Sequence, residues 1–167
     1  MITELLLGEL DREMAGTRRA LERVPEGRND WMPHEKSMPL GYLAGLIATM
    51  PRWIVSIVTE AGLDLASPGQ YRSRAFDSTS ELLGAFDSAV AAARSALLST
   101  TDDRLLLSHW QLLMQGKALS SETRYEAIRV GVMNHLYHHR AQLTSYLRLN
   151  GKPVPALYGP SADEAPF

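Results

Sequence analysis

Three of the chain's five histidines lie close together in the segment NHLYHHRAQ, residues 134–142. His135 and His139 are four residues apart, so in a helix both imidazoles point to the same side. Neutral imidazole is a common ligand for zinc and similar metals, and this spacing occurs in helical zinc sites. The pair therefore predicts a metal site. A hydrogen-bonded pair in the protein core, haem ligation and a pH-sensitive polar contact are the alternatives.

Four segments have the apolar spacing of amphipathic helices, with steps of three and four residues. These stripes cover residues 7–24, 40–57, 83–97 and 125–146. Each stripe can face a common axis, which predicts an all-α fold in one domain, residues 1–167. Pro51 should kink the second helix, because proline lacks a backbone donor and crowds the preceding turn.

Several residues predict where these helices begin and end. Ser37 and Ser78 fit N-caps, and the fourth helix should begin near Ser121 or Glu122. Gly62 and Gly151 fit helix ends. The connections 63–77 and 102–120 are longer than simple bundle turns. The second of them could hold a short hairpin, within 109–119, around Gln115 and Gly116.

Composition narrows the classes of function. The 167 residues are 45% hydrophobic, enough for one sizeable core. A net charge of −2 and scattered basic residues argue against nucleic-acid binding. There is no cysteine, so the chain has no thiolate nucleophile and no cysteine ligand for a metal. Histidine is then the only side chain that offers a strong nitrogen ligand to a metal. The acidic start MITELLLGELDREM lacks the pattern of a signal peptide, and no apolar run approaches the ~20 residues of a membrane span. We therefore expect a cytoplasmic protein with no membrane contact.

Two long segments resemble the motif blocks of the DinB/YfiT-like metalloenzyme superfamily: WMPHEKSMPLGYLAGLIATMPRW, residues 31–53, and MNHLYHHRAQLTSYLRLNGKPVPALYGPSADE, residues 133–164. The resemblance covers nearly the whole chain. It implies a four-helix bundle of the DinB/YfiT type with long interhelical connections, often a homodimer. It also implies a divalent metal, zinc or nickel, held by three histidines. Relatives of this kind include transferases and isomerases that use bacillithiol, mycothiol or glutathione.

The family's ligands carry over only in part. Its two last-helix histidines fall on His135 and His139, but its second-helix histidine falls on Leu46. Leucine has no lone pair, so the metal site is incomplete unless another residue supplies the third ligand. His109 is the first candidate and His34 the second. Their simpler roles are those of an exposed loop histidine and of a local hydrogen-bonding group.

Two functions are compatible with this sequence. The preferred one is a non-catalytic or weakly metal-binding bundle that binds a small apolar molecule in a pocket lined by Leu46, Met50 and Trp53. The alternative is a divalent-metal-dependent S-transferase or hydrolase, with a small-molecule thiol as cosubstrate and a substitute third ligand.

Other motif residues have structural interpretations. Arg140 fits a pair with a carboxylate or a helix end, and Trp110, like Trp53, fits a core position or a pocket wall. The tail at 158–164 should pack back over the bundle, with Asp163 and Glu164 in salt bridges.

Overall fold

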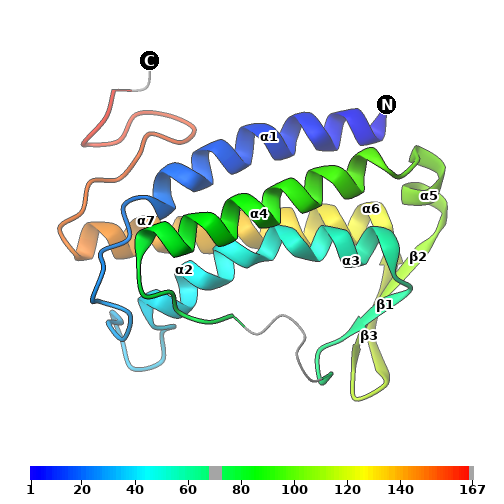
Figure 1. Cartoon of the computed structure of the whole chain (residues 1–167), viewed down its shortest axis with the longest axis horizontal. Coiled ribbons are helices and arrows are strands. Elements are labelled where there is room, and N and C mark those ends of the chain that lie inside the picture. Colours follow the sequence, from blue (N-terminus) through cyan, green and yellow to red (C-terminus); the bar gives the residue numbers. More distant parts are fainter. Residues whose placement is uncertain (68–72, 166–167) are drawn as a thin grey trace.

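The computed structural model of the chain describes residues 1–67 and 73–165, and its helices lie side by side with a small sheet at one end (Figure 1). The helical elements are α1 (Ile2–Leu21), α2 (Leu40–Thr49), the 3-10 turn η1 (Met50–Arg52), α3 (Trp53–Thr59), α4 (Thr79–Leu98), α5 (Asp102–Leu107), α6 (Arg124–Glu126), the π-helix η2 (Ala127–Asn134) and α7 (His135–Leu149). The strands are β1 (Gly62–Asp64), β2 (His109–Met114) and β3 (Lys117–Thr123). Each of the four predicted helical segments is present.

The prediction of an all-α four-helix bundle is nevertheless wrong, because the fold is mixed. Its three strands form a sheet in the order β1-β2-β3, with β1 parallel to β2 and β2 antiparallel to β3. The expected hairpin forms, but it extends to Thr123 and recruits β1 from the connection after α3. A strand of three residues is too short to show alternation, and its parallel partner lies far along the chain.

The hairpin turn has the chemistry that a tight turn requires. Gln115 and Gly116 both have positive φ angles, 51° and 75°, as in a type I′ turn. Their backbone N–H groups donate to the carboxylate of Asp64, at 3.0 and 2.7 Å. These bonds fasten the turn to the end of β1 and so hold the sheet together.

Pro51 interrupts the second helical segment, as its sequence predicts. Here α2 gives way to η1 and then to α3, and the N-cap is Pro39 rather than Ser37. The run Leu40–Thr59 is 20 residues long and apolar enough to cross a membrane by length and composition, contrary to our expectation. However, 67% of an 18-residue window of that run is buried inside the fold, where α2 packs against α4 and α7. These contacts identify it as a core helix.

Side chains cap several helix ends. The Asp102 carboxylate accepts hydrogen bonds from the N–H groups of Ile2 and Thr3, at 3.0 and 2.9 Å, and so holds α5 to the start of α1. Ser78 caps α4 as predicted. The last helical segment begins at Arg124, two or three residues beyond the predicted start, after a capping box formed by Thr123 and Glu126.

The C-terminal tail packs back over the helices, as predicted. Asp163 pairs with Arg148, and Glu164 pairs with both Arg19 and Arg23 of the α1 region. The backbone N–H of Ala156 also donates to Glu164, at 2.9 Å. The tail thereby covers one end of α1 and α7 (Figure 1).

Candidate functional site

The histidine pair lies at the point where the π-helix η2 becomes the α-helix α7. His135 is the first residue of α7 and is half-buried, while His139, one turn later, is 4% exposed. Their Nε2 atoms are 2.8 Å apart. A π-helical segment is uncommon and often occurs at functional sites, because it changes the direction of the residues that follow.

The remaining ring nitrogens determine where the protons lie. The carbonyl of Gly131 accepts a hydrogen bond from the His135 ring, and His139 Nδ1 lies 2.8 Å from the Gln142 amide oxygen, an acceptor. With both outer ring nitrogens donating, the two Nε2 atoms face each other, and one of them must carry a proton for a hydrogen bond to form between them. Burial, and then the neighbouring His139, lower the pKa of His135.

No third ligand joins the two histidines in the described parts of the chain, which contain no group of three His, Cys, Asp or Glu side chains suited to a metal. His34 is exposed and accepts a hydrogen bond from the Lys36 N–H, at 3.1 Å. His109 is exposed at the start of β2. Two nitrogens alone do not fit a catalytic metal, which normally takes three protein ligands.

The three predicted pocket residues, Leu46, Met50 and Trp53, have different surroundings. Trp53 packs edge-on against His135, with ring centroids 6.5 Å apart. Met50, one turn earlier, is fully buried, and Leu46 is half-buried against the core. The helix that carries Leu46, α2, packs against α7 and runs in the opposite direction (Figure 1).

A cavity of about 330 Å³ opens beside His135. Its apolar walls come from three elements: Trp53 and Ile57 of α3, Trp110 and Leu112 of β2, and Ala127 and Val130 of η2. Leu65 also lines the cavity. Both Leu65 and Val130 are exposed, so they form an apolar rim where the cavity meets solvent. Of the predicted pocket residues, Trp53 lines this cavity, whereas Leu46 and Met50 are not among its lining residues.

The register of the hairpin places polar groups on the same wall. Glu122 is the cross-strand partner of Trp110, and Ser120 is the partner of Leu112. Directly paired residues share a face of the sheet, and all four of these side chains line the cavity. The sequence analysis did not predict Glu122 and Ser120 as cavity residues. Side chains alternate between the two faces of a strand, so a strand over 117–123 would have placed residues 120 and 122 on the same face.

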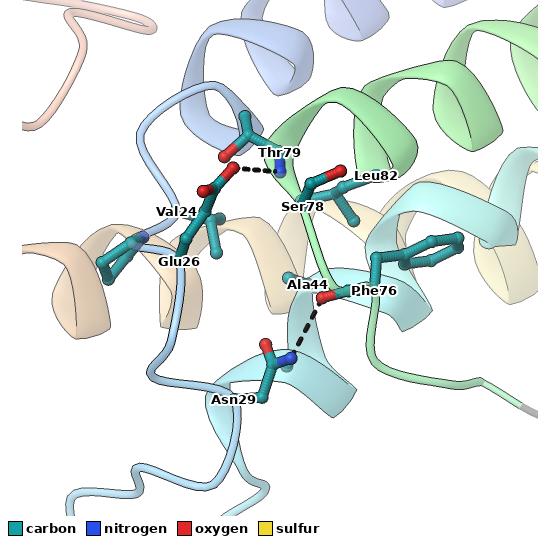
Figure 2. A pocket seen from close by; sticks show the side chains of 10 residues that line it. Val24, Glu26, Asn29, Ala44, Phe76, Ser78, Thr79 and Leu82 are labelled. Carbon is teal, nitrogen blue, oxygen red and sulfur yellow. Dashed lines mark hydrogen bonds between the residues drawn. The ribbon is translucent and has the colours of Figure 1, made fainter.

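A second hollow is too small for a ligand and is crossed by hydrogen bonds that join parts of the fold. It lies where the segment after α1 meets α2 and α4, and it measures only about 10 Å³, roughly the space of one water molecule (Figure 2). Across it, the Thr79 N–H donates to Glu26 at 2.8 Å, and the Asn29 amide donates to the Phe76 carbonyl at 3.0 Å. These bonds connect the segment after α1 to the start of α4 and the residues just before it.

Comparisons with known proteins agree on the fold. The model of the DinB family matches residues 5–166. The crystal structure of a DinB-like protein from Bacillus subtilis is similar over 90% of this chain and 95% of its own, with a TM-score of 0.69 and 19% identity. The crystal structure of a DinB-like protein from Bacillus cereus is similar over 91% of this chain and 95% of its own, with a TM-score of 0.69 and 20% identity. No curated protein matches the chain.

Proposed function

The chain belongs to the DinB family, and on this premise we propose that it binds a small, largely apolar molecule and has an incomplete form of the family's histidine metal site. The observation that carries the proposal is the cavity of about 330 Å³ beside a histidine pair with no third ligand among the described residues. Ligand pockets commonly have this size, apolar and aromatic walls, and a few polar groups that orient the ligand.

The leucine at position 46 is the second argument for an incomplete metal site, because its side chain cannot bind a metal. It stands where the family has its third histidine, and it offers hydrocarbon in place of a lone pair. A divalent ion beside it would lose hydration without gaining a ligand, which is unfavourable. The hydrogen-bonded chain through Gln142, His139 and His135 gives the two imidazoles partners without a metal.

A probe binding experiment tests the cavity. We expect the neutral probe 2-phenylethanol to change the tryptophan fluorescence saturably, because Trp53 and Trp110 line the cavity. The substitution Val130→Trp should weaken binding by narrowing the rim. Leu119→Trp is the matched control, because Leu119 is about as exposed as Val130, 59% against 56%, but does not line the cavity. Absence of saturable binding, or equal binding by both variants, would contradict the proposal.

The orientation of the histidines favours a second candidate, a metal-dependent transferase or hydrolase with a thiol cosubstrate. Metal-binding histidines usually have their other ring nitrogen hydrogen-bonded, and here both rings have such a partner while their Nε2 atoms face each other. This candidate requires His109, His34 or another group to move to the pair. It predicts that His135→Ala lowers the zinc or nickel content, and an unchanged content would exclude it.

The assembly and the location of the protein remain predictions. We propose a homodimer that acts in the cytoplasm. Light scattering coupled to gel filtration tests the oligomeric state, and a monomer mass would contradict the dimer.

A further inference from the structure

The cavity beside His135 has one carboxylate among the described residues that line it, that of Glu122. These residues include neither lysine nor arginine, and their one nitrogen base is the imidazole of His135. The described residues give the Glu122 side chain no ion pair or hydrogen bond, although the residue is half-buried. A half-buried carboxylate without a protein partner favours a cation or a hydrogen-bond donor beside it.

The nearest basic residue in the sequence does not neutralise Glu122. Arg124 has its guanidinium bound to the carbonyl oxygens of Ile57 and Glu60 at the end of α3, and its Nε donates to Ser108 at 2.8 Å. Arg124 is 6% exposed, so these bonds hold it in the interior. Its guanidinium is therefore engaged at the helix end and forms no ion pair with Glu122 among the described residues.

The aromatic walls have the same electrostatic preference as Glu122. Trp53 and Trp110 come from α3 and β2 and both line the cavity. The face of an indole ring is the electron-rich part of its quadrupole, so it attracts a cation and disfavours an anion. Trp110 is also the cross-strand partner of Glu122, which places a ring and a carboxylate next to each other on one wall.

We propose that the ligand of this cavity is an organic cation, an apolar body of aromatic size that carries a protonated amine. The amine pairs with the Glu122 carboxylate, and the body lies among Trp53, Trp110 and the apolar wall. This inference rests on the proposed function, since it specifies the class of small molecule that the cavity binds. Anions of the same size are repelled by Glu122, and the described lining residues offer them neither lysine nor arginine.

Three probes with the same phenyl body test the proposal: 2-phenylethylamine, 2-phenylethanol and phenylacetate, titrated at pH 7 against the full chain. We expect the amine to bind most tightly and phenylacetate most weakly. Glu122→Gln should weaken the amine about tenfold, because it removes a charge-assisted hydrogen bond. Its effect on the alcohol should be several times smaller, because the alcohol carries no charge. Asp103→Asn, an exposed position on α5, controls for the change in net charge.

The outcomes separate the two proposals. If phenylacetate binds as tightly as the amine, or if Glu122→Gln leaves the amine affinity unchanged, the cation inference is wrong, and binding of the alcohol still supports the proposed function. If none of the three probes binds, both the inference and the proposed function are wrong.

Discussion

Arg140 is the residue that most directly ties the histidine-bearing helix to α1. It is 2% exposed and donates to the Glu13 carboxylate at 2.7 Å and to the Thr17 hydroxyl at 3.0 Å. The Tyr137 and Tyr158 rings lie on it, with centroids 5.2 Å from the guanidinium carbon. Arg140 directly follows His139, so its bonds to Glu13 and Thr17 hold the histidine-bearing part of α7 against α1. The sequence predicted a carboxylate partner for Arg140 but could not identify it, because Glu13 is distant in the chain.

Loss of this anchor should be costly. We expect Arg140→Leu to lower the free energy of unfolding by about 3 kcal/mol, because it removes the buried guanidinium that pairs with the partly buried Glu13 carboxylate and bonds the Thr17 hydroxyl. Arg94→Leu is the control, since Arg94 pairs with Asp11 on the surface, where ion pairs contribute about 1 kcal/mol or less. Urea unfolding measures both. Equal losses in the two variants would contradict the role assigned to Arg140.

Gly45, next to Leu46, shows how closely the chain packs around α2. A Cβ at Gly45 would lie 1.9 Å from the Arg74 carbonyl oxygen, whereas a Cβ at Gly84 of α4 meets nothing within 4 Å. Alanine in a helix is otherwise favoured over glycine by about 1 kcal/mol. We therefore expect Gly45→Ala to destabilise the protein by about 1–3 kcal/mol through the backbone clash. Gly84→Ala should stabilise it by up to about 1 kcal/mol. Thermal unfolding in which both variants gained stability would contradict this packing.

At the scale of elements, the long amphipathic helices were predictable, whereas the short helix α5, inside the predicted connection 102–120, and the π-helix η2 were not. The stripes in the sequence identified all four helical segments and the break at Pro51, because these depend on local spacing and on proline chemistry. The π-helix η2 was missed, since residues 127–134 read as ordinary helix and their burial follows the same stripe. The cavity depends on η2 and the hairpin together, so its position could not be predicted from either segment alone.

The docked tail gives a prediction about pH. Hydrogen bonds from Arg23, and then from the Ala156 N–H, lower the pKa of Glu164 from 4.5 to about 2. Because the folded-state pKa is the lower one, this contribution is present above pH 4.5 and is lost as the pH falls towards 2. Glu164→Gln should therefore reduce stability at pH 7, with a difference from the unmodified chain that shrinks below pH 4.5. Glu35→Gln, at an exposed loop position, should show no such trend. A difference that is constant with pH would contradict the assignment.

At the scale of the whole molecule, the sheet is what distinguishes the structure from the predicted bundle. It lies beyond α3, at one end of the helices (Figure 1). Most of the lining residues of the cavity come from α3 and η2 and from the hairpin strands β2 and β3. The sequence indicated the hairpin through Gln115 and Gly116, but β1 joins by parallel pairing, which no local pattern reveals. The pair His135 and His139 was predictable because both residues lie on one helix.

The central claim, that Leu46 leaves the metal site incomplete, is tested most directly by elemental analysis of the untagged protein beside Leu46→His. We predict that the unmodified chain contains far less than one zinc or nickel ion per molecule after exposure to the metals. The Leu46→His variant should bind close to one, because the third nitrogen completes the ligand set. Near-stoichiometric metal in the unmodified chain would contradict the claim and would show that another residue supplies the missing ligand.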